Sequence, residues 1–265
     1  MLINDHFQNY KRYNLHKAQL IIADIPYNIG KNAYGSNPSW YVGGDNKNGE
    51  SDKANSEFFS TDKNFKPAEF MHFCSKMLKK EPKEKGRAPA MLMFCAFEQQ
   101  MYLIDLARRY GLKNYINLVF RKNFSAQVLK ANMRIVGNAE YGLLLYRDKL
   151  PKFNNNGKMI FNIIDWQKDS TKDFLFRKIH PTQKPINLLK KLINIFTDPG
   201  DMVIDPVAGS ASSLVAAKLL GRKQAGFEIN KDFYKEGCQW LDESGKQAMF
   251  NFSKRPEPAQ QLSIV

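Results

Sequence analysis

The sequence predicts an α/β fold: a doubly wound, seven-stranded, mostly parallel sheet with helices on both faces and a small extra lobe. Two observations carry this prediction. The apolar runs are short and rich in β-favouring residues, and stretches with apolar residues at helical spacing separate them. This alternation is typical of a parallel sheet covered on both sides. A length of 265 residues with 43% hydrophobic residues suits one such domain and its core.

Each predicted element follows from its local pattern. The strands are apolar runs bounded by charged or turn-forming residues. In chain order they are residues 2–4, 19–24, 90–95, 115–121, 140–146, 202–205 and 224–228. The helices carry apolar residues three and four apart. They are residues 97–110, 185–196, 211–220 and 232–241.

Three segments fit no part of this sheet. Residues 28–66 are rich in Gly, Asn, Ser and Lys and are predicted to form a flexible loop, because polar loops of that length are usually functional or disordered. Residues 123–138 are basic and are predicted to form a partly helical link. Residues 148–178 mix polar turns with aromatic residues and are predicted to form a separate lobe. The tail from residue 251 is expected to be loosely ordered.

The charge balance indicates a polyanionic partner. Forty Lys and Arg residues against 26 Asp and Glu residues leave a net charge of +14. Clustered cations gain affinity by releasing counterions from phosphates, so nucleic acid is the simplest partner. An ordinary basic enzyme remains the alternative.

The sequence favours a cytoplasmic protein without a membrane partner. No stretch approaches the ~18 apolar residues that span a bilayer, and the first residues lack the pattern of a secretory signal. The three cysteines are widely spaced and form no CxxC pair, which favours buried thiols in a reduced compartment. We therefore expect no metal site.

The first motif is Asp24-Ile25-Pro26-Tyr27, directly after the strand at residues 19–24. Open α/β sheets bind ligands at the carboxyl ends of their strands. Asp24 can accept a hydrogen bond there, and Tyr27 offers a flat face for stacking. On its own the motif is weak, since an Asp that opens a proline turn explains the same residues.

The second motif spans residues 205–212, with the sequence DPVAGSAS, between a strand and a helix. Small residues in such a turn let a ligand approach the backbone, and Ser210 or Ser212 can cap the helix. It is neither a GxGxxG fingerprint nor a P-loop. Glu228 ends the next strand, where an acid commonly binds ribose hydroxyls. A solvated charge at a strand end is the alternative for Glu228.

The third motif is His180-Pro181-Thr182-Gln183-Lys184-Pro185, directly before the helix at residues 185–196. Pro185 suits the first turn of that helix and Thr182 can cap it. An ordinary helix start explains these two residues, but it does not explain the clustering of His, Thr, Gln and Lys.

Together the three motifs resemble those of the S-adenosylmethionine-dependent DNA amino methyltransferases, which modify adenine N6 or cytosine N4. The family's D-P-P-Y stands here as DIPY, its D-P-F-x-G-S-G as DPVAGSA, and its H-P-T-Q-K-P is unchanged. The order, with the catalytic motif first and the glycine turn last, is that of the β group. The resemblance runs from about residue 2 to residue 241 and fades over 31–66 and 148–178.

This resemblance implies a Rossmann-like fold whose parts have distinct roles. Residues 1–147 would be the catalytic part with its flexible loop at 28–66, and residues 148–178 a target-recognition lobe. Residues 179–250 would be the cofactor-binding part, followed by the tail at 251–265. In the β group's permuted order, the strand after the ribose-binding acid lies at the N-terminus, here residues 2–4.

The resemblance also implies the catalytic roles. The target base must leave the duplex stack before its amino group can reach the cofactor. Asp24 and the carbonyl of Ile25 would accept hydrogen bonds from that amino group, Tyr27 would stack on the flipped base, and Pro26 would hold the geometry. No metal or covalent nucleophile is needed.

The implied cofactor is S-adenosyl-L-methionine. Glu228 would hold its ribose, and Asp5 would contact its adenine amino group. The residues expected to line its methionine end are Asp205, Pro206, Val207, Gly209, Ser210 and Ser212. The residues expected near its carboxylate are Thr182, Gln183 and Lys184.

Two residues depart from the family pattern. Ile25 replaces the first proline of the catalytic motif; it keeps the backbone carbonyl, and we expect a softer loop. Ala211 replaces a glycine of the cofactor turn, and we expect a tighter pocket around the methionine end. Neither change is expected to abolish activity.

The implied partner is DNA, double- or single-stranded, in a bacterial or phage-infected cell. The residues expected to contact it are Trp40 in the long loop and the cations Arg121, Lys122, Lys130 and Arg134. For each cation a solvated surface charge is the alternative. A homodimer and a separate restriction partner are left open.

An aspartate at the first catalytic position favours adenine N6 over cytosine N4. The alternatives are cytosine-N4 methylation, methylation of RNA adenine or protein glutamine, and a catalytically silent nucleic-acid-binding protein. Glutamine-modifying relatives place the glycine turn before the catalytic motif, the reverse of the order here. The silent binder is supported only by Ile25.

Overall fold

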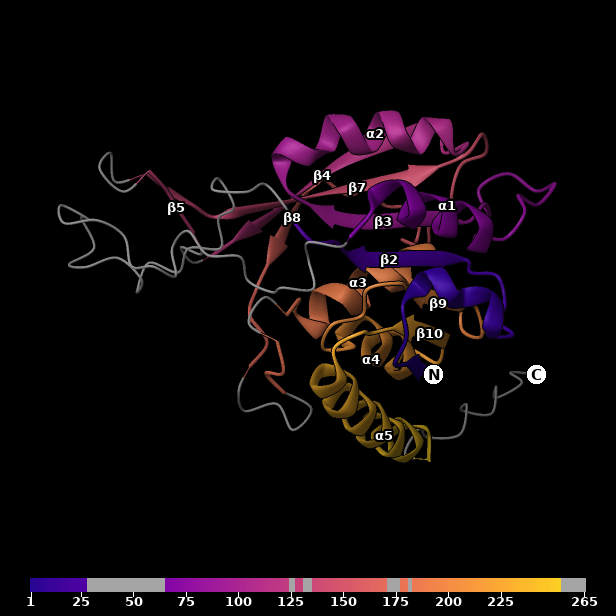
Figure 1. The fold of residues 1–265 in the computed structure, drawn as a ribbon, viewed down its shortest axis with the longest axis vertical. Helices are drawn as coiled ribbons and strands as arrows, with labels where there is room; N and C mark the ends of the chain where they lie inside the picture. The colour runs from indigo at the N-terminus through magenta and orange to yellow at the C-terminus, as the bar shows by residue number, and fades with distance from the viewer. Residues whose placement is uncertain (28–64, 124–126, 131–134, 171–176, 181–182, 254–265) are drawn as a thin grey trace, which may run out of the picture.

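The fold is built on one mixed sheet of eight strands covered by helices on both faces (Figure 1). The computed structural model describes residues 1–27, 65–123, 127–130, 135–170, 177–180 and 183–253. The strand order is β1-β10-β9-β2-β3-β7-β4-β8, and β7 alone runs antiparallel to its neighbours β3 and β4. The predicted doubly wound α/β class is confirmed, with eight strands instead of seven.

Seven strands of the sheet correspond to the predicted ones, with ends that differ by at most one residue. They are β1 (Leu2–Ile3), β2 (Leu20–Asp24), β3 (Ala90–Cys95), β4 (Asn114–Lys122), β7 (Ala139–Tyr146), β9 (Met202–Asp205) and β10 (Lys223–Phe227). The central strands are apolar throughout because both of their faces are buried. In β2, for example, Leu20 and Ile22 pack into one core cluster, whereas Ile21 and Ala23 pack into the other.

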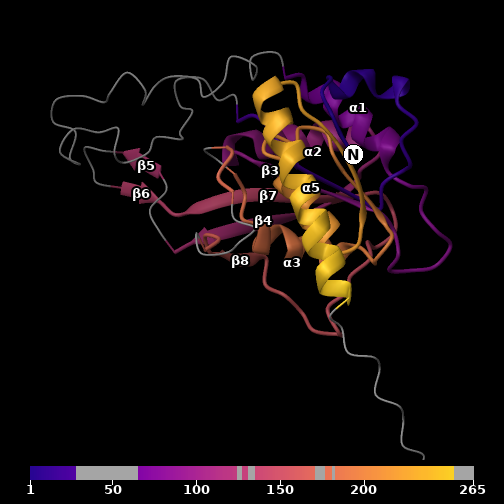
Figure 2. The same cartoon turned by 90° about the horizontal axis from the view of Figure 1, so that it is seen from below.

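Helices separate into two layers that cover opposite faces of the sheet. On one face lie the 3-10 helix η1 (Phe7–Arg12) and helices α1 (Pro67–Met77) and α2 (Gln100–Arg109), the last preceded by the 3-10 turn η7 (Phe97–Gln99). On the other lie α3 (Ile186–Phe196), α4 (Ser212–Leu219) and α5 (Lys231–Ser253), all labelled in Figure 1. Figure 2 shows α3 and α5 from below. Among the described residues, no helix is both long and apolar enough to cross a membrane.

The N-terminal strand closes the sheet beside a strand from the other end of the chain. Leu2 pairs with Gly226, and Ile3 pairs with Phe227, in parallel register. The permuted order predicted this placement of residues 2–4, and it brings Asp5 to the edge of the sheet where Glu228 lies.

Two predicted segments are corrected by the structure. The link at 123–138, expected to be partly helical, contains the strands β5 (Gln127–Lys130) and β6 (Ile135–Gly137), which form a hairpin that projects from the sheet (Figures 1 and 2). A run with Val128, Ile135 and Val136 favours strand pairing. The predicted loop at 28–66 lies almost wholly outside the described residues, and α5 extends to Ser253, past the predicted start of the tail.

The described part of 148–178 contacts the main sheet and the loop before β9. Its strand β8 (Ile163–Trp166) is the eighth strand of the main sheet and pairs in parallel with β4. Asp169 accepts hydrogen bonds from the backbone N–H groups of Ile186 and Asn187, at 2.6 and 3.2 Å, and so caps helix α3. Lys152 forms ion pairs with Asp198 and Asp201 on the loop before β9. A role in target recognition stays a prediction.

Gly226 on β10 is required by close packing. A Cβ at this position would lie 2.7 Å from Leu214 Cδ1 and 2.9 Å from the backbone oxygen of Asp205. That oxygen cannot move without shifting β9, so Gly226→Ala should lower the free energy of unfolding by about 1–3 kcal/mol. Urea denaturation measures the change, and an unaltered midpoint would show that β9 and β10 can separate without cost.

Candidate active site at the carboxyl edge of the sheet

The three sequence motifs converge at one edge of the sheet. Asp205 ends β9, Asp24 ends β2, and Glu228 directly follows β10. These strands are neighbours and run parallel, so their carboxyl ends lie side by side. Lys184 reaches the same edge from the segment before α3 and contacts Asp24. These four residues are far apart along the chain, but the parallel order of the strands brings them together at one edge of the sheet.

The catalytic motif is held from two sides. The N–H of Ile25 donates to the Phe94 carbonyl at 3.3 Å, which extends the ladder between β2 and β3 past Asp24. Gln99, from η7, donates to the Pro26 carbonyl at 3.0 Å. Ile25 is only 2% exposed. The expected softer loop at Ile25 is therefore not seen: its N–H, which a proline lacks, makes a hydrogen bond, and its side chain is buried.

Lys184 binds the catalytic carboxylate directly. Its Nζ donates to Asp24 Oδ2 at 2.5 Å and lies 3.2 Å from Glu140 Oε2. The hydroxyl of Tyr27 donates to the other Asp24 oxygen, Oδ1, at 3.3 Å. The sequence placed Lys184 near a cofactor carboxylate, whereas the structure places it between two protein carboxylates.

Lys122 is also directed into the protein. Its Nζ pairs with Glu140 Oε1 and lies 4.8 Å from the centre of the Trp166 ring, and the side chain is only 9% exposed. The sequence expected a surface contact to phosphate. In this structure its ammonium group instead pairs with Glu140, and a contact to DNA stays a prediction.

Burial and neighbouring charges shift the pKa values of this cluster. Burial raises the pKa of Asp24, and the Glu140 carboxylate adds to the rise, against the opposing effect of Lys184. Burial would also raise the pKa of Glu140, but Lys184 and Lys122 outweigh it and hold that pKa below its ordinary value. Burial lowers the pKa of Lys184, yet the carboxylates of Asp24 and Glu140 outweigh it, so the net shift is upward.

The turn after β9 is built around a buried carboxylate. Asp205 accepts hydrogen bonds from the Val207 N–H at 3.0 Å and from the Ser213 hydroxyl. Burial raises the pKa of Asp205 to about 7, and the carboxylates of Asp24 and Glu228 add to the rise. Gly209 has φ +51°, and Ala211 has φ +64°. A non-glycine residue in that region costs about 1–2 kcal/mol, so the substitution at Ala211 introduces backbone strain.

Glu228 ties this turn to the next strand. Its Oε2 accepts from the Gly209 N–H at 2.7 Å, and its Oε1 accepts from the Asn230 N–H at 2.7 Å. The nearest atom to a Cβ built on Gly209 would be His180 Cδ2, at 4.0 Å. Among the described residues, the turn therefore has space above it, bordered by His180 and Glu228.

The remaining expected cofactor residues differ in how they are engaged. Ser210 and Ser212 are buried, and neither caps α4. Asp5 accepts hydrogen bonds from the His6 N–H, Asn9 and the Tyr13 hydroxyl, at 2.7–2.8 Å. Gln183 does not reach the turn: it donates to the Arg177 carbonyl and accepts from the Ile179 N–H, at 2.7 and 3.2 Å.

Several of the expected residues cannot be placed. Thr182, Trp40 and Arg134 lie outside the described residues, as does the side chain of Lys130. Arg121 is exposed and forms an ion pair with Asp165 at 2.7 Å.

Three residues of the site were missed by the sequence analysis. Glu140 is the second residue of β7 and was predicted only as a strand end, although an acid near the start of an apolar strand was a usable signal. Trp166 and Gln99 carried no local signal.

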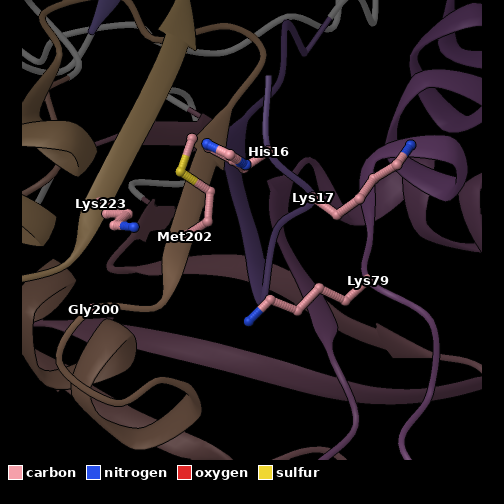
Figure 3. A pocket seen from close by; sticks show the side chains of 6 residues that line it. All are labelled: His16, Lys17, Lys79, Gly200, Met202 and Lys223. Atoms are coloured by element: carbon pink, nitrogen blue, oxygen red, sulfur yellow. The ribbon is translucent and has the colours of Figure 1, made fainter. Parts of the chain in front are cut away.

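A separate pocket of about 330 Å³ lies at the opposite edge of the sheet (Figure 3). Its lining residues are His16, Lys17, Lys79, Gly200, Met202 and Lys223. Met202 and Lys223 begin β9 and β10, so this pocket is at the amino ends of the strands whose carboxyl ends form the site. It shares no residue with the three motifs.

Comparisons with known proteins find relatives among DNA methyltransferases. DNA adenine methyltransferase YhdJ of Escherichia coli K12 is 27% identical over 265 residues, covering 90% of this chain and 81% of the relative. Type II methyltransferase M2.DpnII of Streptococcus pneumoniae is 37% identical over 91 residues, 34% of this chain and 33% of the relative.

Two solved structures share the fold. The M1.HpyAVI–SAM complex superposes with a TM-score of 0.62 at 21% identity, covering 91% of this chain and 100% of that chain. The cytosine-N4-specific PvuII DNA methyltransferase superposes with a TM-score of 0.61 at 12% identity, covering 94% and 92%.

The family model described as DNA methylase, N6_N4_Mtase, matches residues 18–238. That range includes the catalytic motif, the HPTQKP segment, the glycine turn and Glu228. The protein therefore belongs to the N6_N4_Mtase family of DNA methylases.

Proposed function

We propose that this chain is an adenine-N6-specific DNA methyltransferase that uses S-adenosylmethionine. The observation that carries the proposal is the placement of Asp24: Lys184 holds its Oδ2 at 2.5 Å, whereas Tyr27 approaches Oδ1 at only 3.3 Å. One carboxylate oxygen is thus fixed, and the other is left with a long contact that an incoming amino group can replace. The neighbouring turn with Glu228 supplies the place for a cofactor.

The residues at this turn fit a cationic cofactor. Asp205, Asp24 and Glu228 lie near enough to raise the pKa of Asp205 through their mutual repulsion. A positively charged ligand would relieve that repulsion. S-adenosylmethionine, when bound, supplies an electrophilic methyl group on a sulfonium centre. Glu228 is the candidate for its ribose hydroxyls, and the space above Gly209 admits a close approach to the backbone.

The chain's own residues then prepare the target amino group. Its lone pair is delocalised into the base ring, so it is a poor nucleophile until its hydrogens are bound by acceptors. Asp24 Oδ1 and the carbonyl of Ile25 would accept those hydrogen bonds, and Tyr27 would stack on the flipped base. Because the acceptors are fixed before the base arrives, positioning and charge placement supply most of the acceleration.

For DNA contact we propose the segment 148–178 together with Arg121. Trp40, Lys130 and Arg134 remain candidates on sequence grounds. Strand β8 places this segment beside β4, and Arg121 is exposed next to Asp165 across that pair. The +14 net charge supports a polyanionic partner.

The direct test is methyl transfer from labelled S-adenosylmethionine to unmethylated duplex DNA, followed by mass spectrometry of the nucleosides. N6-methyladenine is the expected product. N4-methylcytosine would keep the mechanism but overturn the adenine assignment. Methylation of RNA without methylation of duplex or single-stranded DNA would change the proposed substrate from DNA to RNA. Methyl transfer to neither nucleic acid would favour the catalytically silent nucleic-acid-binding protein.

Asp205 should make cofactor binding depend on pH. Its pKa lies near 7 in the free protein, and the ionised form favours a cationic ligand. Lowering the pH from about 8 to about 6 should therefore weaken S-adenosylmethionine binding, by at most about tenfold per pH unit. Isothermal titration calorimetry measures the slope, and Asp205→Asn should flatten it. An Asp205→Asn variant with the wild-type slope would assign the dependence to another group, including the cofactor's own amine.

A further inference from the structure

We propose that Glu140 and Lys122 are positioning residues of the transfer site, which act through Lys184 to set how tightly Asp24 is held. The inference rests on the proposed role of Asp24 and assigns functions to two residues that belong to none of the three motifs. It predicts that the two residues act in opposite directions.

The four side chains form a chain of alternating charge. Asp24 binds Lys184 at 2.5 Å, Lys184 lies 3.2 Å from Glu140, and Glu140 binds Lys122 through its other oxygen. They come from β2, the segment before α3, β7 and β4. Each inner member therefore has two partners of opposite sign, and a change at one end alters the balance at the other.

Aromatic side chains confine the two ammonium groups. Lys184 Nζ lies 5.2 Å from the centre of the Phe94 ring and 5.5 Å from that of Trp166, and Lys122 Nζ lies 4.8 Å from Trp166. Phe94 and Trp166 are only 1% and 4% exposed. The Lys184 side chain is 6% exposed, so solvent competes little for it. The position of the Lys184 ammonium group is therefore set by electrostatic attraction to the carboxylates of Asp24 and Glu140.

This arrangement gives each positioning residue a distinct effect. Without the negative charge of Glu140, Lys184 pairs with Asp24 and no longer with both carboxylates. The pKa of Asp24 then falls. Without Lys122, the full charge of Glu140 draws Lys184 away from Asp24, and the pKa of Asp24 rises. The other groups near Asp24 stay unchanged in both variants. They are the Tyr27 hydroxyl, the Cys95 thiol and the Asp205 carboxylate.

The experiment is the pH dependence of the single-turnover rate constant for methyl transfer, at saturating DNA and S-adenosylmethionine. Activity should fall on the acid side as Asp24 is protonated. Glu140→Gln should move this acid limb to lower pH, and Lys122→Met should move it to higher pH, each by about one pH unit. The maximal rate of Glu140→Gln should fall roughly tenfold to a hundredfold, the effect of losing a contact to a charged group. Glu140→Asp should restore part of that loss.

A matched control is the exposed pair Arg87 and Glu84, which lie 2.9 Å apart with side chains 61% and 71% exposed. Arg87→Met and Glu84→Gln should leave the profile unchanged. Profiles of Glu140→Gln and Lys122→Met that superimpose on the wild type, or that shift in the same direction, would overturn the proposal. If Glu140→Gln does not fold, Lys122→Met alone tests the proposal. An acid limb moved to higher pH supports it, and an unmoved limb refutes it.

Failure of the proposed function is distinguishable. If the wild type transfers no methyl group, the carboxyl signal of Asp24 can be titrated by ¹³C NMR, assigned through Asp24→Asn. Shifts of opposite sign in the two variants would still support the network, and their absence would refute it. Active wild type with unshifted variants would refute the network and leave the transfer activity standing.

Discussion

Replacing Asp24 by alanine should lower the single-turnover rate of methyl transfer by at least about 10²–10³-fold, the usual cost of removing one preorganised group that stabilises the transition state. The variant loses the oxygen that the target amino group would contact. It should still fold, because Lys184 keeps Glu140 as a partner 3.2 Å away. S-adenosylmethionine binding should persist, because the turn after β9 and Glu228 are untouched.

The measurement is rapid-quench methyl transfer with calorimetric determination of cofactor affinity. Glu84→Ala, which removes an exposed carboxylate paired with Arg87, is the control. Retention of more than about a tenth of the rate by Asp24→Ala would contradict the role of this carboxylate. A lost cofactor affinity would instead show that Asp24 shapes the turn.

Replacing Lys184 by methionine should destabilise the protein by about 3 kcal/mol, the low end of the cost of breaking a buried ion pair by removing one partner. Glu140 retains Lys122, whereas the side-chain partner that Asp24 keeps among the described residues is the Tyr27 hydroxyl. For a protein of this size the loss corresponds to a decrease of roughly 6–12 °C in the melting temperature. Lys184→Arg, which keeps the charge, should lose less.

The deficit of Lys184→Met should depend on pH with a definite sign. Without the ammonium, the folded-state pKa of Asp24 rises further above its unfolded value. Protonated Asp24 needs no cation, so the deficit should be small at low pH and grow as the pH rises through that pKa. Thermal melts near pH 5 and pH 8 measure the difference. Equal deficits at both pH values would mean that Asp24 is not the group left unpaired, and Arg87→Met, which breaks an exposed ion pair, should show no deficit at either.

Much of the sheet could be predicted because its strands are buried on both faces. The continuous apolar runs of β2, β3 and β9 are visible without tertiary information. Helix α1 was not predicted, although Pro67 in its first turn and apolar residues such as Phe70, Phe73 and Met77 at helical spacing were a usable signal. Strand β8 was not readable, since its four residues alternate in burial and sit in a polar segment.

The sequence by itself determined the three motifs, their order and the edge of the sheet at which they meet. Short strings such as DIPY and DPVAGSA encode a strand end and the turn that follows it, so local chemistry suffices. Only the tertiary structure decided what Lys184 and Lys122 bind. Their partners lie 160 and 18 residues away along the chain. A lysine on a surface and a lysine buried between carboxylates look alike in sequence, because the difference lies in which distant strands the sheet brings together.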